Sequence, residues 1–85
     1  MRVDYSRQFL KAASRLPAKL IALADEKEII FKTNPFHPML DTHKLHGKDK
    51  GAWALSINRK YRIKFVFLYG GCVLFLEIGP HDIYR

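Results

Sequence analysis

The chain has 85 residues, of which 48% are hydrophobic and 13% aromatic, and its net charge at pH 7 is +7. This length indicates one small domain, and the apolar and aromatic content is high enough to form a core, which excludes a disordered segment. The single Cys72 excludes an internal disulfide, and no apolar run is long enough to cross a membrane. The positive charge favours a polyanionic partner such as RNA, DNA or an acidic protein; the alternative is a basic soluble domain without one.

The N-terminal part of the chain predicts a strand followed by two helices. Residues 2–5 alternate in polarity and precede Ser6, a residue type that caps helices, so we expect a short strand and then a helix from Ser6 to Leu16. Pro17 ends that helix and opens a second one, which runs to about Lys32, where a Thr-Asn-Pro sequence stops it. We expect the two helices to form a hairpin that packs on a sheet.

The rest of the chain predicts a loop and then three strands. Residues 35–51 contain two prolines and two glycines and no apolar period, which indicates a loop. Residues 53–59, 60–69 and 72–79 alternate in polarity, as strands do, and Gly70-Gly71 suits a two-residue hairpin turn. The predicted fold class is therefore α+β, in which the opening strand and a three-stranded antiparallel meander form one small sheet with the helices on one face.

Alternation along the strands also predicts which side chains face the helices. Aromatic and aliphatic residues occupy one face of the first two long strands, at Trp53, Leu55, Ile57, Tyr61, Ile63, Phe65 and Phe67. In the last strand the more apolar set is Cys72, Leu74, Leu76 and Ile78, rather than Val73, Phe75, Glu77 and Gly79. The opposite face, which we call the open face, is expected to carry Ala54, Ser56, Arg62 and Lys64 and to be bare and basic.

Two segments rich in ionisable residues border this open face, namely the 35–51 loop and the C-terminal tail. The side chains expected to converge there are His43, His46, His81, Lys44, Lys48, Arg62, Arg85 and Tyr84. Such a set suits RNA phosphodiester cleavage, in which a base removes the 2′-hydroxyl proton, a cation stabilises the phosphorane and an acid protonates the leaving 5′-oxygen. Histidine suits both proton transfers because its unperturbed pKa lies near neutrality.

Structural roles are the alternative for several of these residues. His37 is expected to be structural, and the spacing of His37, His43 and His46 matches no known zinc-ligand pattern, so we expect no metal. Arg62 has the alternative of a surface salt bridge with Glu77.

An ordered set of residues extends over nearly the whole chain: His43-Lys44-Leu45 with Gly47, Gly51, Tyr61-Arg62, Ile78-Gly79 and His81-Asp82. Together with the order of the predicted elements, this set resembles the RelE/ParE superfamily of bacterial toxins from type II toxin–antitoxin systems, and most of all its RelE and YafQ branch. The resemblance implies a single RelE-like toxin domain over residues 1–85. It further implies a ribonuclease that cuts translated mRNA on the ribosome without a metal or other cofactor, and a cognate antitoxin as protein partner. The single Cys72 lies in an apolar strand-like run, as expected of a buried thiol in a cytoplasmic protein.

The resemblance also implies roles for individual residues. Arg62 matches the arginine that holds the transition-state phosphate, and His81 matches a catalytic histidine of the YafQ branch. His43 matches a loop histidine of that branch, and Tyr84 lies near a functional aromatic position, one residue closer to His81 than the common pattern. The further residues expected to bind RNA or phosphate are Lys44, Lys48, Lys64 and Arg85.

The chain departs from the family pattern at three positions. Ala54 and Ser56 stand where relatives carry lysines or a histidine, and Lys60 stands where YafQ has an aspartate. Two alternatives to an active ribonuclease therefore stay open: a ParE-like toxin that acts on DNA gyrase, and a catalytically inactive relative that binds an antitoxin.

Overall fold

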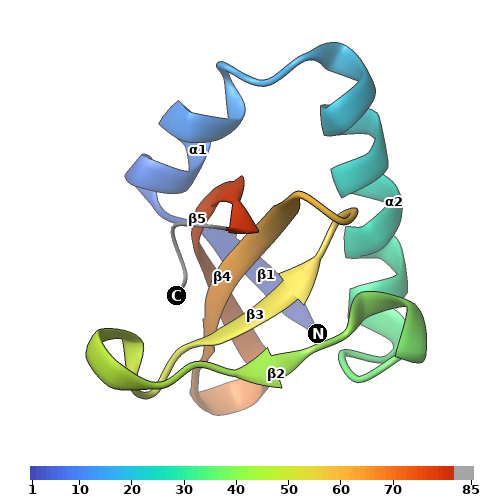
Figure 1. Ribbon diagram of the computed structural model, residues 1–85. Coiled ribbons are helices and arrows are strands. Elements are labelled where there is room, and N and C mark those ends of the chain that lie inside the picture. Colours follow the sequence, from blue (N-terminus) through green and yellow to red (C-terminus); the bar gives the residue numbers. More distant parts are fainter. Residues whose placement is uncertain (82–85) are drawn as a thin grey trace.

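The structure is a computed structural model that describes residues 1–81 and consists of a five-stranded sheet and two helices (Figure 1). The helices and strands are β1 (Arg2–Tyr5), α1 (Arg7–Ala13), α2 (Ala18–Thr33), β2 (His43–Lys44), β3 (Trp53–Ser56), β4 (Tyr61–Phe67) and β5 (Cys72–Pro80). Short 3-10 helices lie at Pro38–Leu40, Gly47–Asp49 and Tyr69–Gly71. The strand order is β1-β5-β4-β3-β2, with β1 parallel to β5 and the other neighbours antiparallel. The predicted α+β class is confirmed.

The helix boundaries follow from local capping. The Ser6 side chain accepts a hydrogen bond from the Phe9 backbone N–H at 3.0 Å, which satisfies a donor that the first turn of α1 leaves unpaired. Helix α1 ends at Ala13, earlier than expected, and α2 begins directly after Pro17. Neither helix of the described chain is long and apolar enough to cross a membrane.

The 35–51 segment contains one strand that was not expected. Strand β2 pairs with β3 through His43 opposite Ala54 and Lys44 opposite Trp53. It adds a fifth strand at the edge of the sheet, so the expectation of a loop without secondary structure is wrong here. A strand of two residues is too short for any periodicity to reveal it.

A change of register in β5 corrects the prediction for its buried face. Phe75 pairs with Phe65 while Glu77 pairs with Lys64, so β5 holds one extra residue, Leu76, at a bulge. Val73 and Phe75 are buried before the bulge and Ile78 after it. The expectation that Cys72, Leu74 and Leu76 face the helices is therefore wrong, and that for Ile78 is confirmed.

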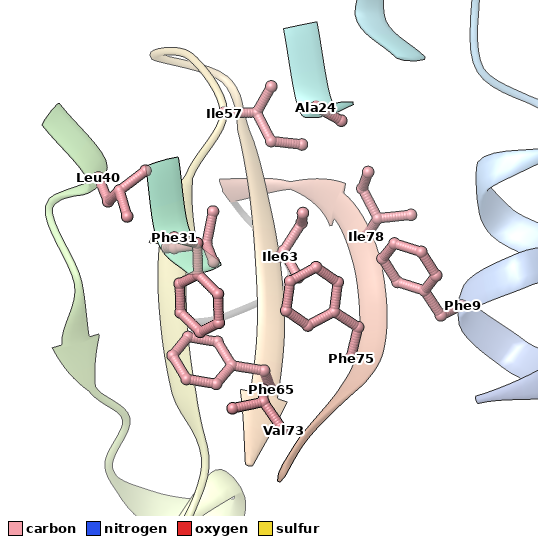
Figure 2. Packing of buried hydrophobic residues seen from close by; sticks show 11 residues of the cluster. Phe9, Ala24, Phe31, Leu40, Ile57, Ile63, Phe65, Val73, Phe75 and Ile78 are labelled. Atoms are coloured by element: carbon pink, nitrogen blue, oxygen red, sulfur yellow. The ribbon is translucent and has the colours of Figure 1, made fainter. Parts of the chain in front are cut away.

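Aromatic side chains pack both helices against one face of the sheet. Phe31 of α2 and Phe65 and Phe75 of the sheet are fully buried, with ring centroids 4.9 Å (Phe31–Phe65) and 5.5 Å (Phe31–Phe75) apart in edge-on contacts. Phe9 of α1 reaches Phe75 at 5.5 Å, and Figure 2 shows these rings in one continuous layer. Burial and edge-on contacts of this kind stabilise the packing of both helices on the sheet.

The open face is bare only at one end. Leu45, Ala52, Ala54 and Val66 form a second apolar cluster on it. The Leu45 N–H donates to the Ala52 carbonyl at 2.9 Å, which continues the pairing of β2 with β3 by one residue and places Leu45 beside Ala52. Ala54 lies on this face as expected but is only 1% exposed, so the expectation of a bare face is wrong here. The uncovered, basic part lies toward the start of β4.

Candidate active site

A hollow of about 510 Å³ lies where the turn between β3 and β4 meets the end of β5. Its lining residues are Arg59, Lys60, Tyr61, Arg62, Pro80 and His81, and we call this place the basic hollow. Tyr61 pairs with Pro80 across β4 and β5, and the His81 N–H donates to the Lys60 carbonyl at 2.5 Å. Strand pairing therefore brings Arg62 and His81 together, although 18 residues separate them in the chain.

The side chain of Asn58 holds the turn between β3 and β4. The Asn58 Oδ1 atom accepts hydrogen bonds from the backbone N–H groups of Lys60, at 2.9 Å, and Tyr61, at 2.8 Å. The Ile57 N–H donates to the Tyr61 carbonyl at 3.0 Å and closes the hairpin. Asparagine is suited to this place because its side chain can hydrogen-bond to the backbone two residues further on.

Arg62 is fixed by this turn rather than by a carboxylate. Its Nη1 donates to the carbonyl oxygens of Asn58, at 2.6 Å, Arg59, at 3.2 Å, and Tyr61, at 3.2 Å. Its Nε atom is buried without a hydrogen-bond partner in the described residues. No carboxylate of residues 1–81 forms an ion pair with Arg62, so its positive charge remains available to an anion in the basic hollow.

Lys64, which was expected to bind phosphate, lies between two carboxylates. Its Nζ is 2.9 Å from Asp49 Oδ1 and 3.0 Å from Glu77 Oε2, and Gln8 Nε2 donates to Glu77 Oε1 at 2.7 Å. Burial is the largest single influence on the pKa of Lys64 and lowers it, but the hydrogen bonds and charges of Asp49 and Glu77 raise it above its ordinary value. Glu77 therefore pairs with Lys64, and the alternative of an Arg62–Glu77 salt bridge is wrong.

The histidine of β2 lies on the same face as Arg62 but outside the basic hollow. His43 is in the cross-strand row of Ala54 and Lys64, whereas Arg62 is in the next row, opposite Ser56. Strand spacing and rise place the Cα atoms of His43 and Arg62 about 12 Å apart. The His43 side chain is exposed, with Nδ1 2.8 Å from the Asp41 carbonyl oxygen.

The remaining loop candidates do not reach the basic hollow. Lys44 is exposed and lies on the opposite face of β2 from His43, because consecutive strand residues point to opposite faces. His46 and Lys48 are exposed. The His37 ring accepts a hydrogen bond from the Met39 N–H at 3.1 Å and so caps a 3-10 helix, as its expected structural role requires.

Tyr84 and Arg85 lie outside the described residues. Within residues 1–81, no three His, Cys, Asp or Glu side chains come close enough together to hold a metal ion.

Sequence reasoning assigned no site role to Asn58 or Arg59, placed Tyr61 only in the family pattern and on the face toward the helices, and treated Lys60 only as a departure from a family pattern. The signal was the concentration of basic residues in the stretch Asn-Arg-Lys-Tyr-Arg at residues 58–62. With these residues in place, the basic hollow combines three cations with one imidazole. Such a set can bind a phosphate group and transfer a proton beside it.

Several solved structures have the same fold as this chain. The chain superposes on a YoeB/ParE toxin from Agrobacterium tumefaciens with a TM-score of 0.79 and 16% identity, covering 95% of this chain and 99% of that one. The superposition on YafQ from Escherichia coli has a TM-score of 0.79 and 17% identity, covering 98% of this chain and 97% of YafQ. For the RelE–RelB complex from Pyrococcus horikoshii the TM-score is 0.75 and the identity 23%, covering 93% of this chain and 92% of the matched one. No family model and no curated protein sequence matches the chain.

Proposed function

We propose that this chain, which has the fold of the RelE/ParE toxins, is the toxin of a type II toxin–antitoxin pair and an endoribonuclease that cleaves translated mRNA. The observation that carries the proposal is the basic hollow, in which Arg62 and His81 lie beside two further cations, Arg59 and Lys60. Its positive lining suits a phosphodiester, and the imidazole supplies a group that transfers protons near neutral pH.

The mechanism places the scissile phosphate against the guanidinium of Arg62, with Arg59 and Lys60 adding positive charge. Negative charge develops on the phosphate oxygens as the 2′-hydroxyl attacks, and fixed cations lower the energy of that transition state. His81 acts as the general acid or base for one of the two proton transfers. Its expected counterpart is Tyr84 or His43, and His43 would have to be brought closer by the bound RNA.

The departures from the family pattern fit a site concentrated on the turn. Ala54 is buried in a cluster with Leu45 and Ala52, so it presents nothing to RNA. Ser56 pairs with Arg62 across β3 and β4, and its side chain is smaller than the lysine or histidine of the relatives. Lys60 lines the basic hollow, where it adds a cation rather than the carboxylate of YafQ.

A cognate antitoxin is the proposed protein partner. The Pyrococcus neighbour was solved in complex with RelB, and a protein of net charge +7 attracts an acidic segment that covers its cations. An antitoxin lying over the basic hollow would block access of RNA.

Primer extension on mRNA from cells briefly induced for this protein tests the proposal. Cuts inside translated codons are expected, and they should vanish in the Arg62→Ala/His81→Ala double variant. The Arg15→Ala/His46→Ala variant is the matched control, because it removes one arginine and one histidine that are exposed and outside the basic hollow. Intact mRNA with arrested growth would favour the gyrase-directed alternative, and intact mRNA with normal growth an inactive relative.

A further inference from the structure

One side chain, that of Asn58, determines the path of the backbone beneath the basic hollow (Figure 1 shows the turn that joins β3 to β4). Its Oδ1 atom accepts two backbone hydrogen bonds, from Lys60 at 2.9 Å and Tyr61 at 2.8 Å. Its own carbonyl oxygen accepts from Arg62 Nη1 at 2.6 Å, the shortest of the three bonds that this nitrogen donates. Asn58 itself is exposed and does not line the basic hollow.

We propose that Asn58 is a positioning residue that holds Arg62 and His81 in their working places; this inference rests on the proposed ribonuclease function. The two bonds to Oδ1 hold the turn so that the carbonyl groups of Asn58 and Arg59 point toward the guanidinium. The guanidinium is thereby anchored through Nη1. Without these acceptors the long side chain of Arg62 would sample many rotamers.

A second link runs from the same side chain to His81. The Tyr61 N–H donates to Asn58 Oδ1 at 2.8 Å, and the carbonyl of the same peptide group, that of Lys60, accepts the His81 N–H at 2.5 Å. A change in the orientation of the Lys60–Tyr61 peptide group therefore disturbs the backbone that carries the imidazole. Asn58 contacts neither the expected phosphate position nor the imidazole, so it acts only through these neighbours.

The side-chain Nε–Hε signal of Arg62 in ¹⁵N-labelled protein tests the inference without relying on catalysis. In the wild type the anchored guanidinium is expected to give a distinct signal that exchanges slowly with water. Asn58→Ala removes the Oδ1 acceptor that holds the turn, so the Arg62 signal should move to the position of mobile surface arginines and exchange faster with water. Asn58→Asp keeps an oxygen at the same place, so the Arg62 signal should remain distinct. An unchanged signal in Asn58→Ala, or equal loss in Asn58→Asp, would overturn the inference.

Cleavage kinetics give the second readout, at a temperature where circular dichroism shows every variant folded. Asn58→Ala is expected to lower kcat about 10- to 100-fold, since small displacements of catalytic groups have effects of this size, with KM changed less than about 3-fold. Asn58→Asp should recover most of kcat. Should Asn58→Ala not fold, Asn58→Ser, which keeps a weaker acceptor, takes its place with an intermediate loss expected. Wild-type kcat in the folded Ala or Ser variant would contradict the inference.

The two readouts separate this inference from the proposed function. If Arg62 becomes mobile in Asn58→Ala but the wild-type protein cuts no RNA, Asn58 positions Arg62 and the proposed ribonuclease function is rejected. If the wild type cuts RNA but Arg62 is undisturbed in Asn58→Ala, the ribonuclease function stands and the positioning role of Asn58 is rejected.

Discussion

Replacing Lys64 by methionine removes the cation that joins two carboxylates across the sheet. Lys64 Nζ lies 2.9 Å from Asp49 and 3.0 Å from Glu77, and the three side chains are only 15%, 28% and 26% exposed. Methionine keeps much of the apolar stem, so the main loss is the pairing of charges. The variant leaves two carboxylates facing each other with no cation between them.

The size of the effect follows from the intermediate burial of the pair. Exposed ion pairs contribute about 0.2–1 kcal/mol, and breaking a buried pair costs about 3–5 kcal/mol. We therefore expect Lys64→Met to lower the free energy of unfolding by about 2 kcal/mol. For a domain of this size, a loss of that magnitude lowers the Tm by roughly 8–16 °C.

Thermal unfolding followed by circular dichroism measures this loss, with Lys48→Met as the control for removing an exposed lysine that forms no ion pair within the described residues. Because pairing raises the pKa of Lys64 in the folded state, its contribution is complete below the ordinary lysine value of 10.5 and is lost as the pH rises through the raised value. The Tm difference between wild type and Lys64→Met should therefore become smaller as the pH rises above 10.5. A Tm equal to that of Lys48→Met at pH 7, or a difference that widens in alkali, would refute the reasoning.

Two further substitutions test local features of the fold by the same unfolding assay. Tyr5→Phe removes the hydroxyl that donates to Glu28 and should cost about 1 kcal/mol. Burial, followed by that hydrogen bond, raises the pKa of Tyr5 from 10.0 to about 12. The contribution of the hydroxyl to stability is therefore complete below pH 10 and is lost as the pH rises toward 12. A stability difference between wild type and Tyr5→Phe that persisted at pH 12 would contradict this role of the Tyr5 hydroxyl. Ser6→Ala removes the bond to the Phe9 N–H and the hydroxyl bond to the Leu76 carbonyl, and should cost about 1–2 kcal/mol, whereas Ser14→Ala, at the end of α1, should cost less. Equal losses from the two serines would show that Ser6 is not the cap.

Local signals in the sequence predicted most of the fold. Ser6 and Pro17 mark helix starts through chemistry that needs no distant partner, and the long alternating segments are strands because their period is two. The bulge at Leu76 was not predictable in this way. It is defined by the pairing of β5 with β4, and a one-residue slip exchanges the two faces of a strand.

The candidate site was predicted only in part. The family resemblance selected Arg62 and His81, and strand pairing brings them together at the basic hollow. The ion pairs of Lys64 were not predicted, because its carboxylate partners come from a loop and from the next strand, and a strand pattern does not show which charges meet. Arg59 was missed because, in a chain of net charge +7, residue type alone does not separate cations of a site from those of the general surface.

Single-turnover cleavage of mRNA on purified translating ribosomes tests the central claim most directly. The account predicts that Arg62→Ala and His81→Ala, each verified as folded, lose about 10²- to 10⁴-fold in rate, and that their combination loses less than the product of the two because they act on one transition state. Arg15→Ala and His46→Ala should stay within a few-fold of wild type. A wild-type protein that cleaves while either Arg62→Ala or His81→Ala keeps the full rate would show that the basic hollow is not the catalytic site.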